Sequence, residues 1–193
     1  MTEHSLQQPP WLDAPLIDES PFADTHDLRH GPDLHPALLG LLPYVGIWRG
    51  RGIGGYPTLE EDFHFGQEVR FSHDGRPFLA YESKAWLIEE DGTPIRPSSR
   101  EVGWIRPVAE TDEIEALFSN PTGIMQLHVG TVDGLKLELA SDAVIRTATA
   151  KSVTADHRLY GIVEGALLYA QEMAAVGHPL TSHLSARLLR VAG

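Results

Sequence analysis

Histidine is the residue type of this 193-residue chain best suited to hold a metal, because the sequence has ten histidines and no cysteine. The absence of cysteine excludes disulfides, thiolate metal sites, iron–sulfur clusters and thiol nucleophiles. His178 and His183 lie close together, but no H-E-x-x-H motif or third ligand accompanies them, which disfavours zinc. Four further histidines lie in turns or opposite apolar neighbours in strands and are expected at the surface: His64, His73, His128 and His157.

His183 leaves two interpretations open. Taken alone, it is a solvated loop residue. It also stands at the entry to the last predicted strand, where a side chain can lean into the mouth of a barrel, and a neutral imidazole is a good ligand for haem iron.

The segment Gly50–Gly55 satisfies the pattern G-x-G-x-x-G of dinucleotide-binding proteins. That fingerprint requires a helix to begin inside the motif, whereas Tyr56-Pro57-Thr58 follows here and the chain continues as strands. We therefore interpret the glycines as a bend in a barrel strand, with Trp48 packed at the closed end.

Other catalytic signals are weak. The sequence has no G-x-S-x-G motif, and nothing joins a serine to a histidine and an acid. Lys84 and Lys136 alternate with apolar residues and are expected to face outward. Lys151 follows a run of small residues, where it is either solvated or able to reach a ligand at the rim of a cavity.

The charge of the chain excludes several classes of partner. Its formal net charge is −12 and its pI is near 5.2, so electrostatic capture of nucleic acid or of an anionic membrane is disfavoured. No apolar run approaches the roughly 20 residues of a membrane helix, and the polar start lacks the features of a secretory signal. We expect a cytoplasmic protein.

The chain divides into an arm and one domain. Residues 1–32 hold five of the 14 prolines and carry a charge of −5, which predicts a flexible acidic arm whose Trp11, Leu16 and Phe22 could still dock on the domain. Residues 33–193 form the predicted domain. It begins with a short helix that is capped by Asp33 and ended by Pro43.

The domain is predicted to be all-β. Apolar residues alternate with polar ones from Tyr44 onward, in runs separated by Gly-containing turns. The predicted strands are 44–53, 63–71, 77–88, 100–106, 113–119, 123–129, 135–139, 143–153, 158–164, 167–174 and 184–191. The last also matches helical spacing, but a barrel needs a final strand to pair with the first. We expect an antiparallel up-and-down barrel of about ten strands, similar in shape to fatty-acid-binding proteins and lipocalins.

Several motifs together resemble the nitrobindin family of haem-binding β-barrels. The G-x-W-x-G-x-G signature is present as Gly46, Trp48, Gly50 and Gly52, and Tyr56-Pro57-Thr58 follows it. The segments 75–79, 103–106, 121–123 and 149–151 and a C-terminal Pro-Leu-x-x-His-Leu match as well, so the resemblance extends from about Leu34 to Val191.

The resemblance implies roles for three side chains. His183 falls on the proximal ligand of haem b, which favours the second of its two interpretations. Lys151 falls on a partner of a haem propionate, a role that a charge-assisted hydrogen bond makes physically reasonable. Thr58 falls on the haem edge.

The implied function is binding of nitric oxide and isomerisation of peroxynitrite to nitrate, at a ferric iron with one histidine ligand and an open sixth position. The resemblance allows a homodimer. The alternative function is a non-catalytic barrel that carries a fatty acid or another hydrophobic ligand. A third interpretation makes the barrel a binding module whose arm recruits a partner.

Overall fold

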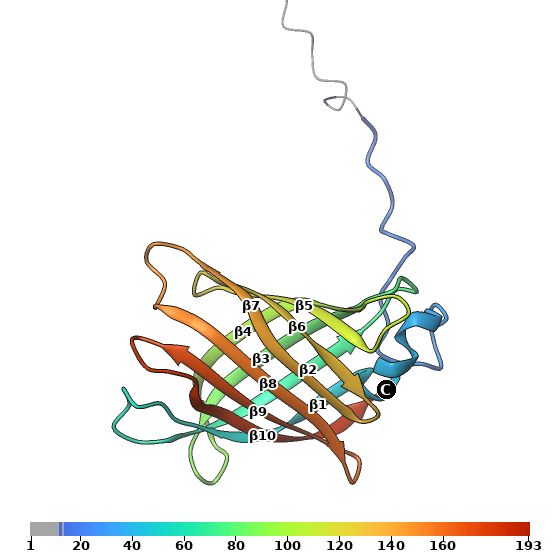
Figure 1. Cartoon of the computed structure of the whole chain (residues 1–193). Helices are drawn as coiled ribbons and strands as arrows, with labels where there is room; N and C mark the ends of the chain where they lie inside the picture. Colours follow the sequence, from blue (N-terminus) through green and yellow to red (C-terminus); the bar gives the residue numbers. More distant parts are fainter. Residues whose placement is uncertain (1–11, 13) are drawn as a thin grey trace, which may run out of the picture.

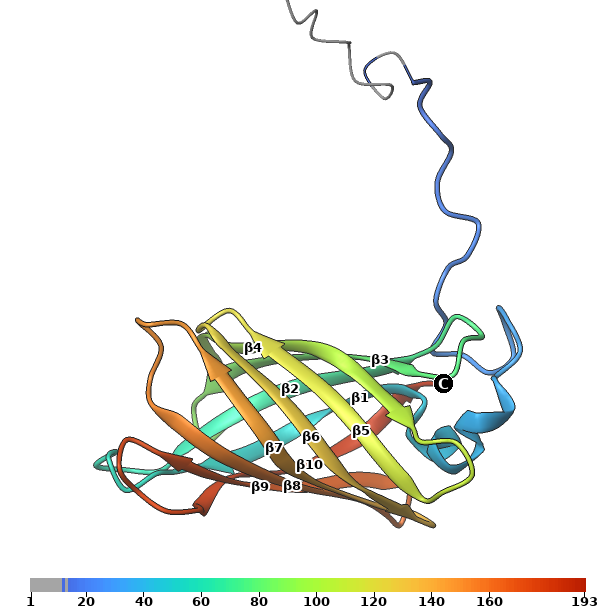
Figure 2. The same ribbon diagram turned by 45° about the horizontal axis from the view of Figure 1, so that its top comes forward.

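Antiparallel pairing joins each strand to the next along the chain and joins β1 to β10, which closes the sheet into one barrel. The computed structural model describes Leu12 and residues 14–193. Figures 1 and 2 show the tilted strands around the barrel, with the short helix and the C-terminus at one end. The ten-stranded antiparallel barrel with a short N-terminal helix is thus confirmed.

The elements follow one another in simple order. They are η1 (Pro36–Tyr44), β1 (Gly46–Gly54), β2 (Phe63–Ser72), β3 (Leu79–Ile88), β4 (Pro94–Pro107), β5 (Glu113–Asn120), β6 (Ile124–Asp133), β7 (Lys136–Arg146), β8 (Val153–Val163), β9 (Ala166–Ala175) and β10 (Thr181–Ala192). The ambiguous last segment is a strand, and it pairs with β1 over its length.

Strand order fixes what lies at each end of the barrel. Because neighbouring strands run in opposite directions, the loops after β1, β3, β5, β7 and β9 meet at one end, which we call the mouth. Helix η1 and the end of β10 lie at the opposite, closed end (Figure 1). The mouth loops span residues 55–62, 89–93, 121–123, 147–152 and 176–180.

Several element boundaries differ from those expected, and β4 and β8 begin at Pro94 and Val153, before the predicted starts at residues 100 and 158. The predicted strands 135–139 and 143–153 are one strand, β7, because no turn residue interrupts it, and the chain turns only at 147–152. The helix is a 3-10 helix whose N-cap is His35 rather than Asp33: the His35 ring accepts a hydrogen bond from the Ala37 N–H, and Pro36 starts the helix. Pro43 lies inside the helix, one residue before its end.

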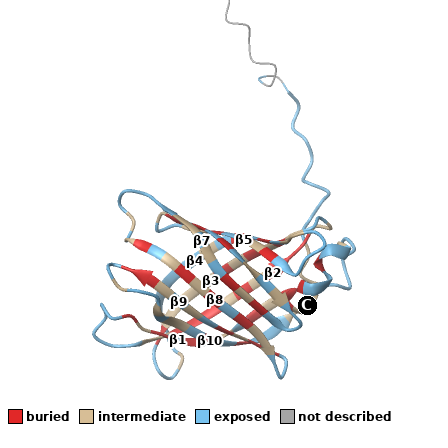
Figure 3. Ribbon diagram, in the orientation of Figure 1, coloured by how far each residue is buried: buried red, intermediate tan, exposed pale blue. Residues whose placement is uncertain are grey.

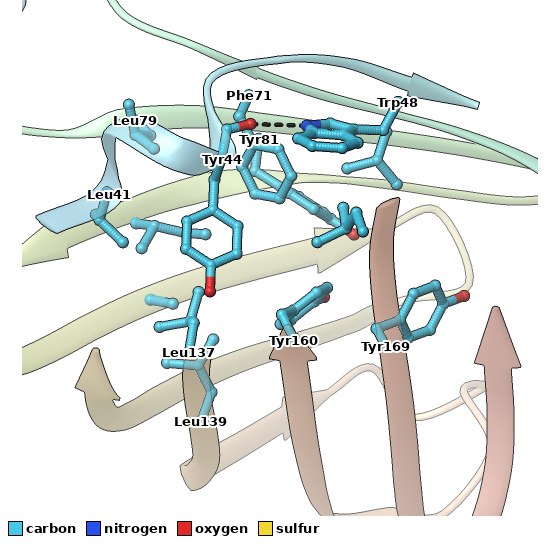
Figure 4. Packing of buried hydrophobic residues seen from close by; sticks show 14 of the residues in the cluster. Leu41, Tyr44, Trp48, Phe71, Leu79, Tyr81, Leu137, Leu139, Tyr160 and Tyr169 are labelled. Atoms are coloured by element: carbon cyan, nitrogen blue, oxygen red, sulfur yellow. Dashed lines mark hydrogen bonds between the residues drawn. The ribbon is translucent and has the colours of Figure 1, made fainter. Parts of the chain in front are cut away.

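The closed end holds the apolar core. Trp48 is fully buried and its indole N–H donates to the Tyr44 carbonyl at 2.8 Å, which ties β1 to η1 (Figure 4). Arg190 lies over the Trp48 ring at 4.2 Å. Buried and exposed residues alternate along the strands, as Figure 3 shows, because successive side chains point into and out of the barrel.

Over residues 125–129 of β6 the apolar residues face outward and the polar residues face inward, opposite to the expected pattern. Its apolar Met125, Leu127 and Val129 are exposed, whereas Gln126 and His128 point inward and are buried. The prediction that His128 lies at the surface is therefore wrong, because Asp156 inside the barrel pairs with its Nε2.

His73 is also buried rather than solvated, since part of the N-terminal segment covers it. Thr25 and His73 exchange two backbone hydrogen bonds of 2.7 and 2.8 Å. Asp24 contacts Ser72 and forms an ion pair with Arg70. Leu16 and Phe22 are exposed and do not dock, while Trp11 lies outside the described residues.

Helix η1 cannot span a bilayer. In the part of the chain that the structure describes, no helix is long and apolar enough to do so.

Candidate functional site

A cavity of about 490 Å³ runs from the mouth into the barrel. Near the mouth its wall includes the apolar side chains of Leu59, Ile124, Val153, Met173 and Leu184 among polar loop residues. Deeper in, polar side chains take over, including Gln67, Ser83, Gln126 and Arg158. A volume of this size suits a cofactor or another small organic ligand.

A β-bulge sets the position of His183 in the cavity wall. Ser182 pairs with Glu172 and Leu184 pairs with Gln171, so His183 between them is the extra residue of β10. Bulges of this kind redirect a side chain and are common beside functional sites. His183 is the one histidine among the cavity-lining residues of the described chain.

Two hydrogen bonds to Gly55 hold His183 in place. The Gly55 N–H donates to the His183 carbonyl at 2.9 Å, and His183 Nδ1 lies 3.0 Å from the Gly55 carbonyl oxygen. Because a carbonyl oxygen only accepts, Nδ1 carries the proton in this bond. In the neutral ring Nε2 is then unprotonated and free to bind a metal, as is usual for metal-binding histidines whose other nitrogen is held by a carbonyl.

Tyr56 supports the His183 ring from one side. The two rings meet edge to face with their centres 5.5 Å apart. The Tyr56 hydroxyl accepts from the Ala175 N–H at 2.8 Å and lies 3.1 Å from the carbonyls of Met173 and Ala175. Tyr56 therefore joins the end of β1 to the end of β9, and His183 lies against this junction.

The structure brings Thr58 and Lys151 to the same cavity as His183. Thr58 lies in the β1–β2 loop and Lys151 in the β7–β8 loop, and both side chains are exposed at the mouth. Among residues 14–193, Lys151 makes no ion pair.

The glycines of the signature motif close the barrel and do not line the cavity. A Cβ atom at Gly50 would lie 2.1 Å from the Arg187 carbonyl oxygen, and one at Gly52 would lie 2.3 Å from that of Ser185. Gly46 has φ of +143° and meets the Ala192 carbonyl in the same way. Strand β1 continues through Gly54 with no helix following, which agrees with the rejection of a dinucleotide site.

His178 does not complete a metal site with His183. It lies in the β9–β10 loop, and its ring packs edge to face against Tyr56, at 5.8 Å between ring centres. Over the described residues, no three His, Asp or Glu side chains are grouped to hold a metal ion. Any metal bound by His183 must therefore bring its other ligands with it, as the iron of a porphyrin does.

A buried charged cluster at the inner end of the cavity was missed by the sequence analysis. Arg158 donates to both carboxylate oxygens of Glu101, at 2.6 and 2.9 Å, and through Nε to Asp156 at 2.7 Å. His128 Nε2 lies 2.7 Å from the same Asp156 oxygen. We call Glu101, His128, Asp156 and Arg158 the buried charge cluster. Its sequence signal is the spacing Asp156-x-Arg158, which puts opposite charges on one face of a strand.

Burial and pairing shift the pKa values of this cluster. Burial lowers the pKa of His128 below its ordinary value, although its hydrogen bond to Asp156 acts in the opposite direction. Burial alone would raise the pKa of Asp156, but Arg158 and His128 outweigh it and the pKa lies well below the usual range. At neutral pH, His128 is thus neutral and Asp156 is charged.

The lowered pKa of His128 predicts that the folded chain loses stability as the pH falls from about 7.5 to about 5.5. Over this range the unfolded chain protonates His128 and the folded chain does not, so protons favour unfolding by up to about 1.4 kcal/mol per pH unit. His128→Gln, which keeps a donor for Asp156, should make the fall shallower. Urea unfolding at each pH measures the free energy of unfolding of both chains.

The matched control for that prediction is Ser141→Ala, which removes the hydroxyl that accepts from the Asp156 N–H and changes no titratable side chain. This variant should lower the free energy of unfolding by a similar amount at each pH and keep the slope of the original chain. An unchanged slope in His128→Gln would contradict the assignment of His128 as a neutral buried histidine.

Comparison with known proteins finds relatives in sequence and in fold. The family model described as "THAP4-like, heme-binding beta-barrel domain" matches residues 37–190. A protein of Salinispora tropica named "Peroxynitrite isomerase" is 66% identical over 197 residues, covering 100% of both chains. A "Ferric nitrobindin-like protein" of Saccharopolyspora erythraea is 48% identical over 182 residues, which cover 93% of this chain and 85% of that protein.

A solved structure has the same fold. The crystal structure of Rv2717c from M. tuberculosis is 41% identical in sequence, with a TM-score of 0.72 over 82% of this chain and 99% of that one. The family model matches most of the chain, and both relatives align along nearly all of it. The chain therefore belongs to the family of THAP4-like, haem-binding β-barrel domains.

Proposed function

We propose that this chain binds haem b at the mouth of the barrel and isomerises peroxynitrite to nitrate. The observation that carries the proposal is His183, whose Nδ1 is held by the Gly55 carbonyl while Nε2 is left free at the wall of the cavity. The names of the Salinispora tropica relative and of a Streptomyces griseus relative at 50% identity, both "Peroxynitrite isomerase", support the activity.

The residues present fit a haem held by one imidazole. The apolar wall near the mouth suits the porphyrin, and His183 supplies one axial ligand. A haem held here would take its imidazole ligand from His183, the one histidine among the lining residues of the described chain. A ferric iron bound in this way would supply a Lewis-acid position for peroxynitrite and a binding position for nitric oxide.

Lys151 and Thr58 act at the rim. Lys151 carries a cation with no ion-pair partner among the described residues, which suits a propionate carboxylate at the mouth. The Thr58 hydroxyl lies across the same opening and can donate a hydrogen bond to the haem edge. The apolar side chains below them exclude water from the iron.

The fatty-acid carrier is the weaker candidate. A barrel that holds a fatty acid inside needs a free cation or donor for its carboxylate. The buried Arg158 already binds Glu101 through both oxygens and Asp156 through Nε, so it is not free to bind a ligand anion. The carboxylates of Glu101 and Asp156 would also repel the carboxylate of a fatty acid.

The N-terminal segment is proposed to act apart from the site. Its contacts through Asp24 and Thr25 lie beside Ser72 and His73, at the closed end of the barrel. His183 and Lys151 lie at the other end. The division into an arm, residues 1–32, and a haem-binding barrel, residues 33–193, is therefore proposed with the arm tied to the closed end of the barrel through Asp24 and Thr25.

We further propose that the outer face of β4 to β7 pairs with a second copy of the chain. Trp104, Leu117 and Leu127 stand side by side on neighbouring strands and are all exposed. Met125 and Ile145 extend the same apolar area. An exposed apolar area of this kind marks an interaction surface.

Loss of the His183 imidazole should abolish specific haem binding. In a titration with hemin, His183→Ala is expected to lower the affinity by at least about 100-fold, since losing only the hydrogen bond to a metal ligand costs about 10- to 100-fold. The Soret band of the bound haem reports the affinity. His178→Ala, the neighbouring histidine, is the control and should bind as the original chain does. Equal affinities in the two variants would refute ligation by His183.

Removal of the Lys151 charge should weaken haem binding modestly. Lys151→Met is expected to lower the affinity about two- to fivefold at low salt, and less at high salt, because an exposed ion pair is screened. Lys136→Met at the closed end is the matched control. A loss that is the same in both variants, or that does not depend on salt, would contradict contact with a propionate.

The haem-loaded chain should speed the decay of peroxynitrite and yield nitrate. Stopped-flow absorbance measures the decay, and ion chromatography measures nitrate and nitrite. The haem-free chain and His183→Ala mixed with the same hemin should give only the background rate. Acceleration without more nitrate, or no acceleration despite a Soret band, would reject the isomerase function.

A charged substitution in the centre of the apolar face should prevent self-association. Light scattering of the original chain is expected to give the mass of a dimer, and Trp104→Lys that of a monomer. Val191→Lys, an exposed apolar residue on β10, should remain dimeric. A monomer mass for the original chain would contradict the proposal.

A further inference from the structure

The buried charge cluster has no part in holding the haem as proposed above. Glu101 and Arg158 line the inner end of the cavity, while Asp156 and His128 lie behind them. The cluster joins three strands: Glu101 lies on β4, His128 on β6, and Asp156 and Arg158 on β8. It therefore sits below any group bound at the mouth.

The formal charge of the cluster is −1. Glu101 and Asp156 contribute two negative charges and Arg158 one positive charge. His128 is neutral, because burial lowers its pKa and its Nδ1 has no hydrogen-bond partner among the described residues. Gln126 and Gln171 complete the cluster with hydrogen bonds and add no charge.

Burial makes this charge effective over a distance. The side chains of Arg158 and Asp156 are 4% and 0% exposed, and that of Glu101 is 16% exposed. Charges out of contact with water interact more strongly than surface charges at equal separation. Arg100 and Lys151 also line the cavity, but both side chains are exposed, so solvent and salt screen their charges.

We propose that the buried charge cluster stabilises the ferric over the ferrous state of the haem in this barrel. Reduction adds one electron to the iron, and the net negative charge beneath the haem opposes that addition. The inference rests on the proposed haem binding at His183 and not on turnover.

Two substitutions of nearly equal shape change the charge in opposite directions. Glu101→Gln removes one negative charge, and Gln126→Glu adds one. Both side chains accept a hydrogen bond from the same nitrogen of Arg158, Nη2. Each should shift the ferric-to-ferrous equilibrium constant by about tenfold, Glu101→Gln toward ferrous and Gln126→Glu toward ferric. For a one-electron couple, tenfold equals 59 mV.

The test is a redox titration of the haem-loaded chain with dithionite and mediator dyes, followed by its absorption spectrum. The midpoint potential should rise in Glu101→Gln and fall in Gln126→Glu. Glu90→Gln, an exposed carboxylate in the β3–β4 loop, is the control and should leave the potential unchanged. A ferric spectrum like that of the original chain shows that each variant holds its haem.

Unchanged potentials, or shifts of the same sign in both variants, would overturn the inference. If one variant does not fold or does not load haem, the other still tests the inference, because each variant has its own predicted direction of shift in midpoint potential. No peroxynitrite is present in the titration. If the haem-loaded chain forms no nitrate but the two variants shift the midpoint potential in opposite directions as predicted, the proposed activity is contradicted and this inference stands.

Discussion

The pairing of β1 with β10 is the interaction on which the site depends. It closes the barrel, and its glycines allow the two strands to approach closely at Gly50 and Gly52. It also sets the end of β1 beside the start of β10, so that Gly55 and His183 exchange a backbone and a side-chain hydrogen bond. The seam of the barrel thereby fixes the orientation of the imidazole.

The inside of the closed barrel is divided into a filled apolar core at the closed end and a cavity that opens at the mouth. Trp48 and its neighbours fill the closed end, while charged and amide side chains fill the middle. The charges are tolerated there because nearly every donor and acceptor in the buried charge cluster has a partner. The result is a cofactor-sized space with an apolar wall at its mouth and a fixed charge below.

Much of this architecture can be predicted from sequence, because strand alternation and turn residues are local signals. Gly75 and Gly92, with φ of +86° and +95°, lie in turns that the sequence indicated. The inward direction of His128 could not be predicted, since it depends on partners brought by other strands. The contact between Glu101 and Arg158 joins residues 57 apart, and no local pattern reports it. The bulge at His183 likewise depends on the register with β9.

The assignment of Lys151 and Thr58 to the rim came from family resemblance and not from spacing. The up-and-down order of the strands supplies the physical reason that these two side chains share the mouth with His183. The most direct test of the central claim is a crystal structure of the haem-loaded chain. The account predicts iron bound to His183 Nε2, with Nδ1 still donating to the Gly55 carbonyl. Haem ligated by another residue, or bound outside the mouth, would contradict it.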